Sequence, residues 1–525
     1  MKKLSTIIIA TALVLSLGQC KKQETTTGSD LPNAADGSVY ITLKVGNDGS
    51  KHGVHPESGI YGFTNGDILY VGNNGHYVGT LTYANGAFSG IIAEPSTDDY
   101  LHFFFTGGKA PETDPTAGTT TSFTVNIADQ GTQLPVLSYG QSTEKYTNTT
   151  ATYSTILRNK CGLVKFNPLI ATNNAITVSG MKTEATISFA TGAEGIAPTA
   201  TTGTVTLYPQ SDAEKWAILL PQDAVSNPAV NISGNSYSSS TIASVPAVTA
   251  NMYYTAGVDI SMTPHGALSG SFTINANGDK VHFAQGNLQY TKSTSTWSFM
   301  DYQYTTVETN EQNVGADYAN QDVVSLFAWG TSGWANGNHF YQPYNTINAT
   351  NTYPATIGYG YGPTDGSNYT YSLTDAYANA DWGVYNAISN GGNAANIWRT
   401  LTNDEWTYIK DHNTKGFSEV EGVKGVVIRP DDVTTPIASS YDADSWATEE
   451  AAGSVFLPAA GVRYTGGNGA LVTNVADFGR YWSSTNSGSD KAWRMNFSIQ
   501  NNNSGSMIAA IRWHGCSVRL VCPAN

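Results

Sequence analysis

The sequence predicts a mainly β protein: two tandem β-sandwich domains followed by an α+β domain. Its 525 residues exceed what one hydrophobic core usually organises, so several domains are expected. Only 13% of the residues are charged, while 53 are Gly and 30 are Tyr, which favours short strands and frequent turns over long helices. Short runs that alternate apolar and polar residues recur between Gly/Asn turns, and this pattern indicates half-buried strands.

The N-terminal region has the pattern of an export signal. A basic start precedes an apolar run over residues 4–17, which is too short to span a bilayer comfortably, and Cys20 follows shortly after. We expect a lipoprotein signal peptide over residues 1–20 and lipidation of Cys20; simple cleavage is the alternative. Residues 21–35 are polar and Thr-rich, which predicts a flexible tether.

A first β-sandwich domain is predicted for residues 36–142. Every second residue of 39–45 is apolar, the pattern of a strand with one buried face. The pair Asn85-Gly86 separates two alternating runs and predicts a tight hairpin. Residues 101–105 are apolar enough to form a central strand.

Two further domains are predicted beyond the first. Residues 146–263 continue the pattern of short strands, and the Pro/Gly-containing stretch 264–270 marks a boundary. In the third domain, residues 268–525, the composition changes, because all but one of the 11 Trp residues follow the boundary. Thr402 with Glu405 forms a capping box, which predicts a helix there.

Residues 36–263 resemble the fimbrillin (type V pilin, Mfa-like) family in layout. The resemblance rests on Gly-Asp-Ile-Leu-Tyr-Val at 66–71, on Leu81-Thr82-Tyr83 before Gly86 and Phe88, and on a closing Tyr-Tyr-Thr strand at 253–255. It implies two sandwich domains, proteolytic removal of the first strand, and completion of the vacated groove by a strand of another subunit. That cleavage often follows Arg in the family, whereas here Lys44 and Lys51 are the possible sites.

Residues 268–525 resemble the major paralogous domain (FISUMP) and Lcl C-terminal families, which are similar to the C-type-lectin-like fold. Six ordered blocks carry this resemblance. They are residues 281–290, 327–333, 398–406, 456–461, 481–485 and 517–521. The resemblance implies a lectin-like fold and is only loosely tied to surface adhesion.

Two kinds of binding site can be considered in the third domain. Calcium needs several oxygen ligands, and Asp431 and Asp432 after Pro430 are weak candidates; the alternative is a solvated turn. Calcium is therefore left open, and no other cofactor is predicted. Sugar binding without a metal needs exposed aromatic faces beside polar groups, and the candidates for that role share the segment 329–344. They are Trp334, His339, Tyr341 and Tyr344.

Together these observations predict a non-enzymatic adhesin on the cell surface, as an outer-membrane lipoprotein or in a fimbria. It would be an accessory or tip subunit that pairs with other subunits by strand exchange and presents a lectin-like domain to a glycan or a surface protein. The alternative is a lipid-anchored glycan-binding protein that does not polymerise. A remote alternative is an enzyme with the fold of formylglycine-generating enzymes, for which Cys516 and Cys522 would be the paired thiols. The net charge of -15 argues against nucleic acid as a partner.

Overall fold

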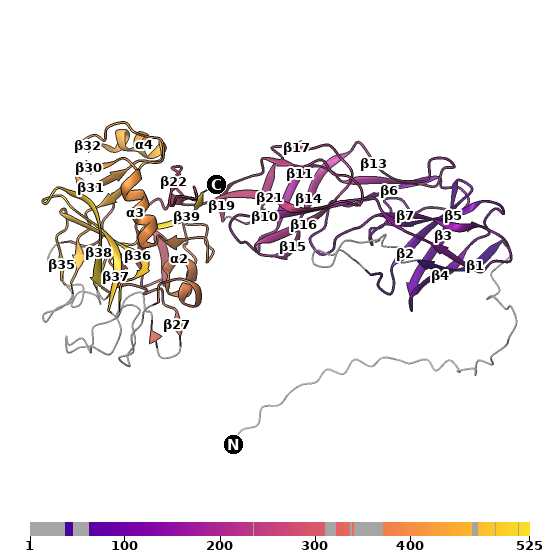
Figure 1. Cartoon of the computed structure of the whole chain (residues 1–525), viewed down its shortest axis with the longest axis horizontal. Helices are drawn as coiled ribbons and strands as arrows, with labels where there is room; N and C mark the ends of the chain where they lie inside the picture. Colours follow the sequence, from indigo (N-terminus) through magenta and orange to yellow (C-terminus); the bar gives the residue numbers. More distant parts are fainter. Residues whose placement is uncertain are drawn as a thin grey trace, which may run out of the picture.

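The computed structural model describes residues 37–45, 62–234, 236–309, 322–336, 339–340, 371–464, 471–488, 490–512 and 514–524. Strands greatly outnumber helices in these ranges, which confirms the prediction of a mainly β protein. Figure 1 shows an elongated molecule with the first sheets at one end and the C-terminal domain at the other. Within the described ranges, no helix combines the length and apolar character needed to cross a membrane.

The first sheet closes on itself. Its strands follow the order β5-β2-β3-β4-β1-β8-β7-β9, and β5 also pairs with β7. The strands are Ser38–Val45 (β1), Ile68–Asn73 (β2), His76–Ala84 (β3), Ala87–Ala93 (β4), Tyr100–Phe105 (β5), Ser138–Lys145 (β7), Thr152–Thr155 (β8) and Arg158–Asn159 (β9). The expected hairpin is present, because Asn85 and Gly86 both adopt positive φ between β3 and β4.

Strand β1 completes this closed sheet. It pairs antiparallel with β4 and parallel with β8. Ile41 and Leu43 are almost fully buried among the apolar side chains of the sheet, whereas Lys44 is exposed. The alternation read from the sequence therefore gave the correct buried face.

The second group of sheets starts later than the sequence suggested. Strands β8 and β9, which the expected boundary at 142–146 assigned to the second domain, pair within the first sheet. Conversely, β6 (Ser122–Asn126) lies before that boundary and pairs with β12 of the second group. Backbone pairing thus separates the two groups near residue 160, and β6 crosses between them.

The second group contains a five-stranded sheet in the order β15-β16-β10-β21-β19, two three-stranded sheets and one two-stranded sheet. The strands are Gly162–Pro168 (β10), Ile176–Lys182 (β11), Glu184–Ser188 (β12), Gly195–Pro198 (β13), Thr202–Thr206 (β14), Tyr208–Ser211 (β15), Glu214–Leu219 (β16), Val225–Ser226 (β17), Val230–Ile232 (β18), Tyr237–Thr241 (β19), Ser244–Val245 (β20) and Tyr253–Pro264 (β21). One buried cluster contains Phe104 from the first sheet together with Leu163 and Trp216 from the second group. The two sandwich regions therefore share part of their core.

The junction with the C-terminal domain is packed. The His265 N–H donates to the Ser236 carbonyl at 3.1 Å. Gly392 approaches the same carbonyl so closely that a Cβ at this position would lie 2.4 Å from it, and its φ is +87°. Glycine is needed here because only a residue without a side chain allows this backbone approach.

The C-terminal domain brings its two ends together. Its first strands and its last strand lie in one sheet, in the order β22-β23-β39-β29. The strands of the domain are Phe272–Thr273 (β22), Lys280–Phe283 (β23), Leu288–Thr291 (β24), Thr296–Phe299 (β25), Val323–Val324 (β26), Ala335–Asn336 (β27), His339–Phe340 (β28), Arg399–Thr400 (β29), Lys415–Val420 (β30), Val423–Ile428 (β31), Ser440–Tyr441 (β32), Val455–Pro458 (β33), Val462–Arg463 (β34), Val472–Thr473 (β35), Phe478–Asn486 (β36), Lys491–Ser498 (β37), Asn503–Ile511 (β38) and Leu520–Ala524 (β39).

The helices of this domain are short. They are the 3-10 helix η1 (Asp375–Ala380) and the α-helices α2 (Trp382–Tyr385), α3 (Asn403–His412) and α4 (Ala443–Ala451). Helix α3 begins at the predicted capping box, because the Thr402 side chain accepts from the Glu405 N–H and the Glu405 side chain accepts from the Thr402 N–H. Its buried residues are Trp406 and Ile409, which pack in the core beneath it.

Candidate functional site

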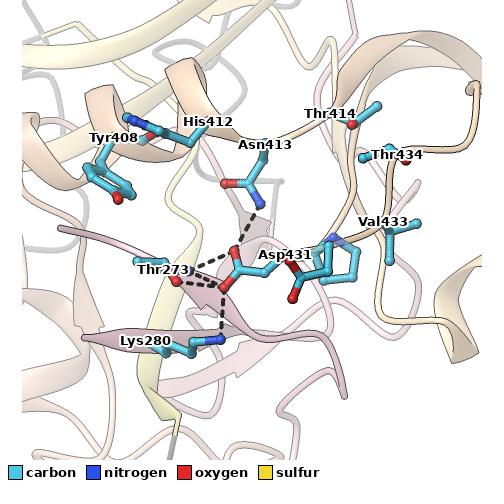
Figure 2. A pocket seen from close by; sticks show the side chains of 11 residues that line it. Thr273, Lys280, Tyr408, His412, Asn413, Thr414, Asp431, Val433 and Thr434 are labelled. Atoms are coloured by element: carbon cyan, nitrogen blue, oxygen red, sulfur yellow. Dashed lines mark hydrogen bonds and ion pairs between the residues drawn. The ribbon is translucent and has the colours of Figure 1, made fainter. Parts of the chain in front are cut away.

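A polar pocket of about 300 Å³ lies where helix α3 ends above strands β22 and β23. Figure 2 shows three sides converging on Asp431: the end of the helix, the strand pair below it and the loop that follows β31. The residues that line the pocket are Thr273, Lys280, Tyr408, His412, Asn413, Thr414, Pro430, Asp431, Asp432, Val433 and Thr434.

Asp431 anchors the floor of the pocket. The Thr273 N–H and hydroxyl both donate to its carboxylate, the hydroxyl at 2.6 Å. Lys280 Nζ lies 3.1 Å from Oδ2, and Asn413 Nδ2 donates to Oδ1 at 3.3 Å. Burial opposes ionisation of this carboxyl, but the hydrogen bonds from Thr273, Lys280 and Asn413 outweigh burial and lower the pKa of Asp431 below its usual value.

Two rings form one wall of the pocket. Tyr408 and His412 are four residues apart on α3 and therefore share a face of the helix. Their centroids are 3.9 Å apart and their planes differ by 15°. His412 Nδ1 lies 2.8 Å from the Tyr408 carbonyl, which can only accept, so in the neutral imidazole Nδ1 carries the proton and Nε2 can accept from a ligand.

The remaining lining groups suit a hydroxylated ligand. Asn413 uses its amide nitrogen on Asp431 and on the Arg429 carbonyl, which leaves its Oδ1 as an acceptor. Asp432 and Thr434 are exposed at the rim. A ring wall beside amide, carboxylate and hydroxyl groups matches the two kinds of surface on a sugar, which has CH patches and hydroxyl groups together.

The two metal-ligand candidates from the sequence, Asp431 and Asp432, have different surroundings. Asp431 is committed to protein donors on both oxygens, and Asp432 is exposed on the adjacent turn with a φ of 65°. In the part of the chain that the structure describes, no group of three or more His, Cys, Asp or Glu residues could hold a metal ion. The geometry places Asp431 in a hydrogen-bonded floor, and calcium binding by Asp431 and Asp432 stays a prediction.

The aromatic candidates lie elsewhere or outside the described residues. Trp334 does not line the pocket; it is half-buried against the core and makes an edge contact with Tyr377 at 6.4 Å. His339 belongs to the short strand β28. Tyr341, Tyr344, Lys51 and Cys20 lie outside the described residues. Tyr408 and His412 were not among the predicted residues, although their spacing of four residues on a helix with a recognisable start was a usable signal.

The cysteines have the properties of core residues. Cys161, Cys516 and Cys522 are free and buried. Burial raises the pKa of Cys161 and of Cys522 to about 12. Because the thiolate is the nucleophile, the raised pKa of Cys522 makes that residue poorly suited to serve as a reactive thiol.

Comparisons with known proteins give the following matches. The model of a domain of unknown function, DUF8237, matches residues 406–521. No curated protein matches the chain. A crystal structure described as a "putative cell adhesion protein" from Bacteroides uniformis is 16% identical with a TM-score of 0.29, over 43% of this chain and 98% of that one.

Two other similar structures carry fimbrial descriptions. A fimbrial protein from Bacteroides ovatus is 10% identical with a TM-score of 0.24, over 94% of this chain and 100% of that one. The fimbrial anchor protein Mfa2 from Porphyromonas gingivalis is 10% identical with a TM-score of 0.23, over 39% of this chain and 76% of that one. All these TM-scores are below 0.5, so the functions in these descriptions belong to those proteins and are not assigned to this chain by the match.

Proposed function

We propose that this chain is a non-enzymatic surface adhesin that caps a fimbria: it accepts a strand from a neighbouring subunit and presents its C-terminal domain outward. The observation that carries the proposal is a difference between its first and last strands. Strand β1, the first strand described, lies between β4 and β8 and completes the closed sheet. Strand β39, the last strand described, is paired on both sides inside the C-terminal domain. These pairings support an acceptor role for the β1 position, and they commit β39 to its own domain.

The acceptor role follows from the position of β1. Removing β1 would leave unpaired backbone groups on β4 and β8. It would also empty the space that Ile41 and Leu43 occupy in the apolar core. An apolar groove flanked by two strand edges is a template that an extended segment from another chain can complete.

The pairing of β39 argues against its donation to another subunit. Strand β39 pairs with β23 over four residue pairs, from Lys280↔Ala524 to Phe283↔Val521, and with β29 on its other side. Val521 and Cys522 are fully buried. Withdrawing β39 for donation would break both ladders and open the core, so this strand serves its own domain.

Maturation would need cleavage on the C-terminal side of β1. Lys44 is exposed, but it lies within β1 opposite Ser154 of β8. A protease binds its substrate as a separate extended segment, so cleavage at Lys44 requires the end of β1 to leave the sheet first. Cleavage after Lys51 would release the whole of β1 together with a lipid at Cys20.

The pocket around Asp431 supports the adhesin half of the proposal. Its stacked rings, amide and hydroxyl groups fit a glycan on a host or microbial surface. The alternative function, a lipid-anchored glycan-binding protein that never polymerises, uses the same pocket and keeps β1 in place. The two functions therefore differ at the N terminus and in their location.

Mass spectrometry of the protein in sheared fimbriae and in membranes separates these two functions. For a capping subunit we expect a mature N terminus between residues 44 and 52 in the fimbrial fraction. A Cys20→Ala variant should lose metabolic labelling with a fatty acid in the precursor. If only chains with an intact 39–45 segment are found, and none in fimbriae, the capping proposal fails and the membrane-anchored alternative stands.

A further inference from the structure

Three arginines from three strands gather around residues 514–517 of the C-terminal domain. Arg480 of β36 lies opposite Asn496 of β37, and Trp482 lies opposite Arg494, so both arginines project from the same face of this hairpin. The backbone of Arg463, on β34, bonds to Gly515 in both directions at 2.9 Å. The Ser517 N–H donates to the Arg480 carbonyl at 2.9 Å. We call Arg463, Arg480 and Arg494 the arginine cluster.

All three arginines are buried, and Arg480 and Arg494 are short of countercharge. Arg463, Arg480 and Arg494 are 2%, 5% and 7% exposed. Arg480 donates to the Tyr464 hydroxyl at 2.8 Å and lies over the rings of Tyr464 and Phe478. Ring faces offer partial negative charge, which does not balance a full cation.

Arg494 is less well satisfied. Its Nη1 donates to Cys516 Sγ at 3.3 Å, and a thiol is a weak acceptor. The Nε atoms of both Arg480 and Arg494 are buried with no hydrogen-bond partner, and so is Nδ1 of His514 beside them. Throughout the described ranges, no ion pair joins Arg480 or Arg494 to a carboxylate.

Other arginines of the same domain show how this chain normally satisfies a guanidinium. Arg399 and Arg429 each form two-point bonds to a carboxylate, of Glu405 and Glu449. The fully buried Arg519 donates to Asn287 and to the Ala284 and Phe456 carbonyls, and it also contacts Gln303. Against these, Arg480 and Arg494 have unused donors and no anion.

His514 is partly buried beside these positive charges, and both conditions disfavour its protonated form. The pKa of His514 is lowered to about 4, first by burial and then by Arg494, Arg480 and Arg463. His514 is therefore neutral near pH 7 and adds no charge to the cluster. Burying guanidinium groups without a counter-ion costs several kcal/mol for each ion, so a folded domain with this arrangement gains from a bound anion.

We infer that the arginine cluster binds an oxyanion group, a carboxylate, phosphate or sulfate, between the guanidinium groups of Arg480 and Arg494. The planar fork of Arg matches paired oxygens of this kind, and the free Nε atoms are the donors such a group would engage. The Asp431 pocket shares none of these residues. The inference therefore does not depend on the adhesin proposal.

Calorimetric titration of the full chain with sodium phosphate and with sodium acetate, at constant ionic strength in chloride, tests the inference. We expect one site per chain for at least one of the two anions. Arg480→Gln and Arg494→Gln should each weaken binding roughly ten- to a hundredfold, the loss expected for a hydrogen bond to a charged group. Arg399→Gln, which removes a guanidinium already paired with Glu405, is the control and should bind as the wild type does.

Thermal unfolding of the same variants covers the case in which an acidic residue of this chain already fills the cluster. In chloride alone, the Gln variants should unfold at or above the wild-type temperature, because they no longer bury an unpaired charge. If Arg494→Gln does not fold, Arg494→Lys keeps the charge without the fork and should still bind more weakly. Unfolding well below the wild type, no saturable binding of either anion, or equal binding by wild type and variants would each overturn the inference.

Discussion

At the scale of single residues, Asp431 organises the pocket. Asp431→Asn keeps the shape of the side chain but loses the charge that draws in Thr273, Lys280 and Asn413. We expect a loss of about 1–3 kcal/mol in the free energy of unfolding near pH 7. Equilibrium urea unfolding of both proteins measures it.

The pH dependence of this difference has a definite sign. The pKa of Asp431 in the folded chain lies below the ordinary value of 3.8, so the wild type gains stability from ionisation above that value. The gain should disappear as the pH falls below 3.8 and through the lowered pKa. A difference between wild type and Asp431→Asn that persists unchanged in stronger acid would contradict this account of the floor.

The ring wall formed by Tyr408 and His412 can be tested by substitution. Tyr408→Ala should weaken binding of the full chain to its best glycan on an array about three- to tenfold, because stacking on an aromatic ring contributes about 0.5–1.5 kcal/mol. Tyr385→Ala is the matched control, since Tyr385 is exposed on α2 and does not line the pocket. Equal loss in both variants, or none in Tyr408→Ala, would remove the ring wall from the site.

Residues with local signals were predictable. The capping box at Thr402 needs only a spacing of three residues, and the structure contains it. His514 gave no such signal. Its position among three arginines depends on strands that are distant in sequence.

At the scale of elements, strand β1 has the most specific role. Leu43→Ala should reduce the free energy of unfolding of the N-terminal region by about 2–5 kcal/mol, because it opens a cavity in the closed sheet. Lys44→Ala changes an exposed neighbour on the same strand and should cost less than about 0.5 kcal/mol. Urea unfolding measures both, and similar values for the two variants would show that β1 is not an integral strand.

Strands were easier to predict than their partners. Alternating residues identified β1 and the hairpin at Asn85-Gly86, because strand faces and tight turns are local properties. The pairing of β6 with β12, and of β8 and β9 with the first sheet, joins segments that no local pattern connects. The boundary expected at 142–146 failed to anticipate these pairings for that reason.

At the scale of the whole molecule, the C-terminal domain should fold alone. Its opening strands β22 and β23 pair with its closing strand β39, so residues 268–525 contain both ends of their own sheet. We expect the isolated fragment to be soluble and to unfold in one cooperative thermal transition. Near-ultraviolet circular dichroism during heating measures this transition. Solubility only in the presence of residues 36–263 would show that the packed junction is part of its core.

Composition predicted this domain better than its site. The concentration of Trp after residue 270 indicated a separate aromatic core, and Trp382, Trp398, Trp406 and Trp482 are all nearly fully buried there. The pocket assembles Thr273, Asp431 and the end of α3 from three distant segments. Tertiary packing brings these segments together, and a single sequence does not show which distant segments meet.

The hydrogen bonds between Thr273 and Asp431 also offer a path for mechanical force through the C-terminal domain, if a ligand bound in the pocket is pulled. A pull on a ligand in the pocket reaches β22 through that carboxylate, and the chain from Thr273 leads back to Pro264, the last residue of β21. Tension then runs along β21, whose parallel ladder to β10 is loaded in shear, with its hydrogen bonds strained together and not one after another. Helix α4 and strands β36 to β38 lie off this short load path, so the C-terminal domain could stay folded while β21 carries such a pull.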